Sequence, residues 1–214
     1  MSGEATSRRG RPRGSGGAQL LDIARAEFLR HGYARTTMDA VAAAARISKN
    51  SLYREFPSKG VLYAAVVTDW VDRGRDAMRP HTEVLAAAPD TEAALRAFAR
   101  VLQAAILSPP VLQMRTLVAA EAPLFPEVAR DYIARSWDRN LDTLADAFRR
   151  LAERGAIATD APHTAAEQFT WLAIAAPLNR LTLQAGAEHV PPAELDRIAD
   201  EAVATFLARF GPRN

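Results

Sequence analysis

The chain has 214 residues, 49% hydrophobic and 24% charged, which is typical of a globular protein and argues against a disordered or fibrous one. It has no cysteine, which excludes disulfides and thiolate metal sites, and we identify neither a secretory leader nor an apolar stretch of membrane-spanning length. We therefore expect a cytoplasmic protein with no membrane partner. Residues 1–60 carry 11 Lys+Arg against 5 Asp+Glu, whereas residues 61–214 carry 16 against 20. This asymmetry indicates a polyanionic partner for the amino-terminal part.

Residues 1–16 are predicted to be a disordered basic arm, because the run "RRGRPRGSGG" lacks apolar residues. Within it, the stretch "RGRP" is similar to the core of an AT-hook, whose arginines lie along a narrow minor groove. This likeness makes Arg9, Arg11 and Arg13 candidate DNA contacts. The alternative is a solvated tail that adds only non-specific attraction.

The apolar spacing along the rest of the chain has the helical period. A first helix is expected at 18–31, with Leu21, Ala24 and Phe28 on one face and Gly32 as its stop. Two short helices follow inside 36–56, and a longer one begins near Ser58. Further helices are expected at 91–107, 110–121, 124–154, 162–186 and 192–210. The prediction is an all-α fold, with a three-helix unit followed by a larger helical body.

Residues 36–56 predict a helix-turn-helix. Thr36 and Asp39, three residues apart, form a capping-box-like start for the first helix, and Ser48 is the expected N-cap of the second, residues 49–56. Leu52 and Phe56, four residues apart in that second helix, should face inward. An ordinary αα-hairpin is the alternative that this pattern leaves open.

The second helix would then expose side chains suited to a major groove, which are Lys49, Asn50, Ser51, Tyr53 and Arg54. Asn can pair with adenine, Lys and Arg with guanine, and Ser with any base edge, while an aromatic ring can touch a thymine methyl group. Lys59 and Thr37, at the starts of two helices, are candidate phosphate contacts.

The stretch "HGYARTTMDAVAAAARISKNSLYREFPSKGVL" (residues 31–62) strongly resembles the DNA-binding domain of TetR/AcrR-type bacterial regulators. The resemblance implies a DNA-binding domain at 17–62, in which Thr37, Tyr53 and Lys59 contact the backbone or nearby groups. It also implies that Lys49, Asn50 and Ser51 face bases, and we include Ser48 and Arg54 in the same surface. The sequence departs from the family at Arg46, where a turn glycine is usual, and at Gly60, where Glu is common.

The stretch "MRTLVAAEAPLFPEVARDYIARSWDRNLDTLADAFRRLAERGAIATD" (residues 114–160) resembles the carboxy-terminal domain of the AefR-like subgroup, more loosely. This implies that residues 63–214 bind a small-molecule effector and form a homodimer. We expect a mostly apolar pocket. The candidate pocket residues are Met114, Leu117, Trp137, Leu141, Phe169, Trp171 and Leu178, each with plain core packing as its alternative. Candidate polar anchors, or simply surface residues, are Arg115, Glu121, Asn140 and Asn179.

The last helix carries a wide apolar stripe that includes Leu195, Ile198, Ala202 and Phe206, and these are the candidate dimer residues. The helix before it, around Ala165 to Leu183 and rich in Ala and Leu, is its predicted partner, and these two helices from each subunit would form a four-helix bundle. The alternative is that the stripe packs within its own subunit.

We expect no enzyme activity, because no P-loop, nucleophile-elbow or dinucleotide-binding run occurs. We expect no cofactor and no metal site, since His163 and Glu167 have a ligand spacing but no third ligand. The prediction is a sequence-specific regulator, a repressor released from a palindromic operator by a small, largely apolar effector. The alternatives are a low-specificity architectural DNA-binding protein without an effector, and a small-molecule-binding protein whose DNA reader has degenerated.

Overall fold

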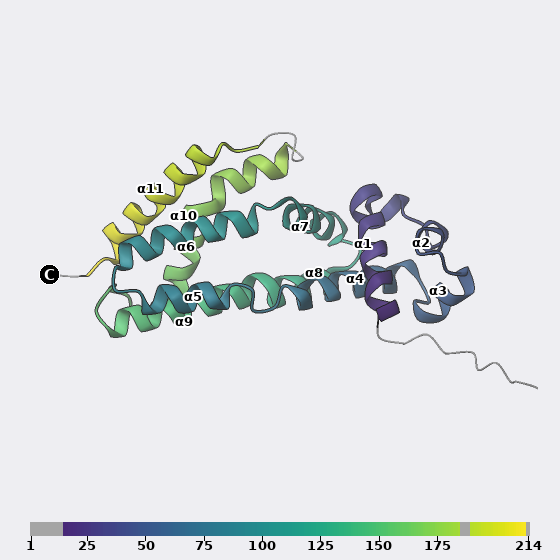
Figure 1. Cartoon of the computed structure of the whole chain (residues 1–214), viewed down its shortest axis with the longest axis horizontal. Helices are drawn as coiled ribbons and strands as arrows, with labels where there is room; N and C mark the ends of the chain where they lie inside the picture. Colours follow the sequence, from purple (N-terminus) through teal and green to yellow (C-terminus); the bar gives the residue numbers. More distant parts are fainter. Residues whose placement is uncertain (1–14, 185–188, 213–214) are drawn as a thin grey trace, which may run out of the picture. The chain divides into compact units, whose positions relative to one another are not determined.

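The computed structural model describes residues 15–184 and 189–212, where every regular element is a helix, so the all-α prediction is confirmed. The chain divides into two compact units, Met1–Asp69 and Trp70–Asn214. The amino-terminal helices are α1 (Ser15–Arg35), α2 (Met38–Ala44), α3 (Lys49–Glu55) and α4 (Lys59–Arg73), the last of which crosses the division (Figure 1). The carboxy-terminal unit continues with α5 (Arg79–Ala87), α6 (Thr91–Ile106), α7 (Pro109–Glu121), α8 (Pro126–Tyr132), η1 (Ile133–Asp138), α9 (Arg139–Glu153), α10 (Pro162–Leu183) and α11 (Pro192–Phe210).

The amino-terminal unit is built on a buried aromatic cluster. Phe28 and Tyr63 are fully buried, and their rings meet edge to face with centroids 5.8 Å apart. The Tyr33 ring lies against both, at 5.9 Å from Phe28 and 5.3 Å from Tyr63. Since Phe28 is on α1 and Tyr63 on α4, this cluster holds those two helices together.

Gly32 bends α1 and does not end it. The helix continues to Arg35 across a kink at Gly32, whose φ of 73° is open to glycine without a steric cost. The buried Thr36 hydroxyl donates to the Gly32 carbonyl at 2.8 Å and to the Glu27 carbonyl at 3.2 Å. The Thr36 hydroxyl is therefore used within α1 and does not cap the next helix.

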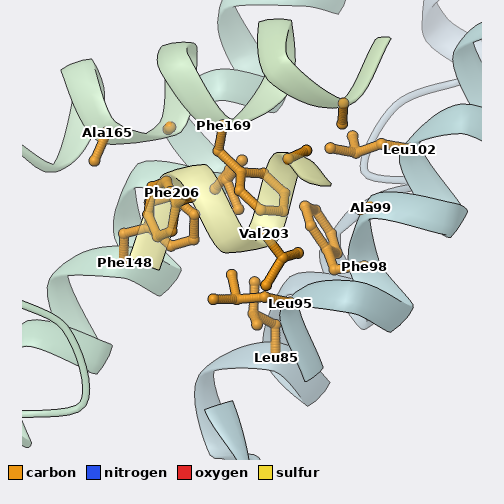
Figure 2. Packing of buried hydrophobic residues seen from close by; sticks show 14 of the residues in the cluster. Leu85, Leu95, Phe98, Ala99, Leu102, Phe148, Ala165, Phe169, Val203 and Phe206 are labelled. Atoms are coloured by element: carbon orange, nitrogen blue, oxygen red, sulfur yellow. The ribbon is translucent and has the colours of Figure 1, made fainter. Parts of the chain in front are cut away.

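The core of the carboxy-terminal unit is a set of phenylalanines from separate helices. Phe148 of α9, Phe169 of α10 and Phe206 of α11 meet with ring centroids 5.0 to 5.7 Å apart, and Phe98 of α6 stacks on Phe169 at 6.2 Å (Figure 2). All four rings are buried. Burying each such side chain contributes roughly 1.5–3 kcal/mol, so this cluster fixes how α6, α9, α10 and α11 pack.

Two stretches differ from the sequence expectation. The single helix expected at 124–154 is instead α8, the π-helical segment η1 and α9 in direct succession. The sequence analysis gave no helix between the one that begins near Ser58 and the one at 91–107, whereas the structure has α5 there, with Pro80 in its first turn. A proline is well tolerated there, since the first N–H groups of a helix have no intrahelical partner.

Two aspartates spaced four residues apart connect the end of α4 and the following turn to η1 and α9 by ion pairs. Asp72 accepts hydrogen bonds from Arg135 and from Arg75, and Asp76 accepts from Arg139 at 2.7 Å. The hydrogen bond from the paired arginine is the main cause that lowers the pKa of each carboxyl, from Arg135 at Asp72 and from Arg139 at Asp76.

In the part of the chain that the structure describes, no single helix is long and apolar enough to cross a membrane. The helices α6 and α7 meet the length and composition criteria only as a pair, bent by 59°.

Candidate nucleic-acid interface

The helix α2 is held at both ends by its own sequence. Thr37 has extended backbone dihedrals, and its side-chain oxygen accepts from the Ala40 N–H at 3.1 Å, so Thr37 and not Thr36 is the N-cap. Met38, Val41 and Ala42 are buried beneath α2. Thr37 was predicted as a phosphate contact, and the structure leaves its side chain exposed at this helix start.

The turn between α2 and α3 passes through a left-handed residue. Arg46 has a φ of 54°, and the Ile47 N–H closes the turn by donating to the Ala42 carbonyl at 3.0 Å. A residue with a Cβ is disfavoured in this conformation, by roughly 1–2 kcal/mol for a regular left-handed turn. The turn therefore keeps the geometry that a glycine would suit, although arginine occupies the position.

Ser48 is the N-cap of α3, as the sequence predicted. The Ser48 side chain accepts from the Ser51 N–H at 3.1 Å, and the two hydroxyls lie 2.9 Å apart. Leu52 is completely buried and Phe56 is half-buried, which fixes the face of α3 that turns inward. The opposite face presents side chains to solvent.

That outward face carries the predicted reading residues. Lys49, Asn50, Tyr53 and Arg54 are exposed, with Tyr53 46% accessible, and Ser51 is half-buried. An exposed aromatic ring between an amide and a guanidinium is an arrangement that can contact base edges in a major groove.

Lys49 has a partner that the sequence analysis did not identify. Its ammonium lies 2.5 Å from the Asp39 carboxylate of α2, and both side chains remain more than half exposed. Asp39 had been noted only as a capping residue. Ten residues of separation across a turn give no sequence signal for such a contact, because it depends on the angle between two helices.

Lys59 also has partners within the protein. Its ammonium donates to the carbonyls of Tyr33 at 2.8 Å and Ala34 at 3.2 Å, and it lies 4.3 Å from the centre of the Tyr33 ring. These carbonyls belong to the last turn of α1, where a cation offsets the negative end of the helix dipole. The predicted phosphate ligand is thus a cap for α1 in this structure. Arg9, Arg11 and Arg13 of the predicted arm lie outside the described residues.

The predicted pocket residues fall into two groups. Five are buried in the packed core of the carboxy-terminal unit, namely Met114, Leu117, Leu141, Phe169 and Leu178. The other two, Trp137 and Trp171, are partly accessible, with ring centroids 5.0 Å apart and planes tilted by 40°.

A polar group, Arg115, lies beside one of these tryptophans. The Arg115 guanidinium lies 5.9 Å from the centre of the Trp137 ring. Tyr132, at the end of α8, has a pKa raised by burial, while the nearby charge of Arg115 acts in the opposite direction. Arg115 had been considered as a polar anchor, whereas Tyr132 had not, because nothing in the local sequence distinguishes it from an ordinary surface tyrosine.

The candidate dimer residues are less accessible than a binding face requires. Ala202 and Phe206 are buried in the core of their own subunit, and Leu195 and Ile198 are half-buried. The apolar stripe of α11 is thus largely used inside the subunit, where Phe206 packs on Phe148 and Phe169.

Exposed apolar side chains lie on α10, the other helix that the sequence predicted for the dimer. Trp171, Leu172 and Leu183 are all exposed, Leu183 by 76%. Trp171 and Leu172 also line an open groove of about 630 Å³ between α10 and α11. Single exposed apolar residues are common on protein surfaces, but several along one helix indicate an interaction surface.

Within residues 15–184 and 189–212, no three histidine, aspartate or glutamate side chains are grouped so that they could hold a metal ion. His163 lies 3.6 Å from Asp142, which is an exposed ion pair if the imidazole is protonated.

Comparison with known proteins finds a matching family for a stretch at each end of the chain. Residues 20–66 match the family described as "Bacterial regulatory proteins, tetR family", and residues 93–212 match "AefR-like transcriptional repressor, C-terminal domain". Among curated relatives, the HTH-type transcriptional repressor SCO4008 of Streptomyces coelicolor is 26% identical over 179 residues, which are 64% of this chain and 93% of that protein.

Two solved structures are similar over almost the whole chain. A TetR-family transcriptional regulator from Mesorhizobium loti has a TM-score of 0.86 and 30% identity, covering 94% of this chain and 100% of that one. The Flavonoid-responsive Regulator FrrA has a TM-score of 0.66 and 26% identity, covering 92% and 99%.

Proposed function

The chain belongs to the TetR family of bacterial transcriptional regulators, and on this premise we propose that it binds a specific DNA sequence through α3. The observation that carries the proposal is the division of α3 into two faces. Leu52 is buried against the unit, while Lys49, Asn50 and Tyr53 are exposed to solvent. Asn50 would pair with adenine and Lys49 with guanine, and Tyr53 would contact a thymine methyl group or the adjoining backbone.

The basic arm would add to this binding. Arg9, Arg11 and Arg13 would follow the minor groove beside the site read by α3. Deleting residues 1–14 should weaken binding and flatten the dependence of log affinity on log salt, because fewer phosphates are neutralised. An unchanged salt dependence would contradict a role for the arm.

We further propose that two copies of the chain associate through the outward face of α10 with the adjoining part of α11. The exposed apolar residues Leu172 and Leu183 support this surface, since a second copy would remove them from water. A two-fold dimer would place two α3 helices on half-sites about 34 Å apart, one turn of duplex, which requires a palindromic operator.

Sedimentation of two leucine variants tests this surface. Leu172→Asp should convert a dimer to a monomer, because it places a charge in an apolar interface. Leu124→Asp is the matched control, since Leu124 is also an exposed leucine but lies between α7 and α8. A dimer that persists in Leu172→Asp and dissociates in Leu124→Asp would overturn the assignment.

The effector that we propose is a planar, largely apolar aromatic molecule bound beside Trp137 and Trp171. The two accessible indole rings support this choice, because aromatic rings whose centroids are already 5.0 Å apart offer flat apolar surfaces on which a third ring could stack. Arg115 beside Trp137 would suit a phenolate or carboxylate on such a ligand. FrrA, a relative of 26% identity, is named as flavonoid-responsive, which agrees with a planar effector.

A thermal-shift titration with a flavone and a saturated, non-planar analogue tests the effector class. The flavone should raise the unfolding temperature and quench tryptophan fluorescence, and the analogue should do neither. Trp137→Phe should weaken the quenching, whereas Trp70→Phe should not, since Trp70 is on α4. Equal responses to both compounds would contradict a planar site.

Repression is the proposed mode of regulation, and the name of the Streptomyces coelicolor relative as a repressor supports it. Effector binding would favour a conformation in which the two α3 helices fit their half-sites poorly. A coupling of about 1–3 kcal/mol is sufficient to change operator occupancy 5- to 150-fold.

Footprinting on the DNA that flanks its own gene tests the DNA-binding proposal. We expect protection of two related half-sites and a preference of roughly 10³-fold or more over random duplex. Asn50→Ala should lose this preference, and Asn140→Ala should keep it, because Asn140 is an equally exposed asparagine on α9. Binding without preference would favour an architectural role instead.

A further inference from the structure

The ion pair between Asp39 and Lys49 joins the two helices of the DNA-reading motif. The Asp39 carboxylate is in the first turn of α2, Lys49 is the first residue of α3, and their charged groups lie 2.5 Å apart. The contact places a negative charge directly beside an exposed residue that is proposed to read DNA.

Stability does not account for this pair. Both side chains are more than half exposed, and exposed ion pairs contribute little to folding because water screens them and because two side chains lose freedom. Asp39 is already favourable at the amino end of α2, where a carboxylate complements the helix dipole. Lys49 is in the unfavourable position for a cation, and the carboxylate of Asp39 offsets this.

The pair has a direct consequence for the encounter with DNA. A free lysine at this position would bind any phosphate, which strengthens binding to every sequence equally. An ammonium has three donor hydrogens, so Lys49 can keep its bond to Asp39 and still donate to a base edge. The carboxylate itself is repelled by phosphates.

We propose that Asp39 is a specificity-determining positioning residue that keeps Lys49 from the phosphate backbone and directs it to a base edge. This inference rests on the proposed reading of DNA by α3. On a wrong sequence, Lys49 finds no acceptor and stays paired, and Asp39 adds repulsion. On the correct sequence, the base contact is retained, so the ratio of specific to non-specific affinity rises.

The test compares Asp39→Asn with wild type on a random-sequence duplex and on the duplex that wild type protects in footprinting. Asp39→Asn should bind the random duplex more tightly and should gain about 0.9 in the slope of log affinity against log salt, as expected for one further phosphate contact. That slope corresponds to an additional loss of affinity of about 3.5-fold between 50 and 200 mM salt. Affinity for the protected duplex should change less, so the specificity ratio falls.

Two further variants separate this role from a general charge effect. Asp146→Asn makes the same change in net charge at an exposed ion pair with Arg149 on α9, and it should leave the salt slope unchanged. In a Lys49→Ala background, Asp39→Asn should no longer steepen the slope, because the lysine that would reach the phosphate is absent. Circular dichroism of each variant confirms that the fold is retained.

The outcomes distinguish this inference from the proposed function. If wild type protects no sequence, the DNA-reading proposal itself fails. If wild type protects a site but Asp39→Asn keeps the wild-type slope and specificity ratio, the role of Asp39 is refuted and α3 remains the reader. An equal change in Asp146→Asn would also refute it.

Discussion

Replacing Gln103 with leucine should destabilise the carboxy-terminal unit, because it removes the donor that replaces a missing helical hydrogen bond. Pro177 lies inside α10 and has no N–H, so the carbonyl four residues earlier, at Ala173, cannot be paired within the helix. The Gln103 side-chain amide of α6 donates to this carbonyl at 3.1 Å and to the Leu195 carbonyl of α11 at 3.0 Å. Gln103 is only 3% exposed, so water cannot take its place.

The size of the effect follows from the orphaned carbonyl. A buried acceptor left without a donor costs about 1–3 kcal/mol, whereas leucine fills a volume similar to that of glutamine. For a chain of this length, each kcal/mol lowers the unfolding temperature by roughly 2–4 °C. We therefore expect Gln103→Leu to lower the unfolding temperature measured by circular dichroism by several degrees. Gln113→Leu is the matched control, since Gln113 is exposed on α7.

A double-mutant cycle with Pro177→Ala isolates this cause. Alanine at 177 restores an N–H that can pair with the Ala173 carbonyl, so Gln103→Leu should cost clearly less in that background. If Gln103→Leu lowers the unfolding temperature equally with proline and with alanine at 177, the carbonyl is not what Gln103 satisfies. The reasoning would then be refuted.

Three more predictions concern the backbone and the titratable groups. Arg46→Gly should stabilise the amino-terminal unit by up to about 1 kcal/mol in urea unfolding, because relief of the left-handed arginine exceeds the entropy that glycine adds to the unfolded chain. The lowered pKa values of Asp72 and Asp76 mean that their contribution to stability is present above the ordinary carboxyl pKa and is lost as the pH falls through the lowered values. Thermal unfolding of the double variant Asp72→Asn/Asp76→Asn should therefore lose less stability than wild type in acid, below about pH 4. Absorbance titration should show that Tyr132 ionises above the ordinary pH for tyrosine of about 10, and that the phenolate step disappears in Tyr132→Phe.

Each of these has a clear contrary result. A lower urea midpoint for Arg46→Gly would show that the arginine side chain stabilises the fold by more than its left-handed backbone destabilises it. Parallel acid profiles for wild type and the aspartate variant would show that the ion pairs do not persist in solution. If the ionisation step that disappears in Tyr132→Phe occurs in wild type at or below the ordinary pH for tyrosine, the burial of Tyr132 is contradicted.

Local signals in the sequence predicted the reading motif well. Ser48 caps α3 and Leu52 is buried beneath it because both effects act within one turn of helix and need no distant partner. The same locality explains why the helical fold and the ends of α6, α7 and α11 are close to expectation. The cap of α2 was placed one residue early, because the competing bond of Thr36 to the Gly32 carbonyl depends on a kink.

Features that depend on tertiary contacts could not be predicted in this way. An apolar stripe on α11 looks the same whether it faces its own core or another subunit, and Phe206 proved to face the core. The pairing of Asp39 with Lys49, the capping of α1 by Lys59 and the donation from Gln103 each join residues on different helices. Their geometry is set by helix packing, which sequence periodicity does not specify.

The central claim is that the outward side chains of α3 read base sequence. Selection of binding sites from random duplexes, carried out in parallel with wild type and with Asn50→Arg, whose guanidinium pairs with guanine where the asparagine amide pairs with adenine, tests it most directly. The account predicts that wild type enriches a palindrome and that the variant enriches a different base at the same position in both half-sites, with the flanking bases unchanged. Recovery of the same palindrome by both proteins, or of no common sequence by wild type, would contradict it.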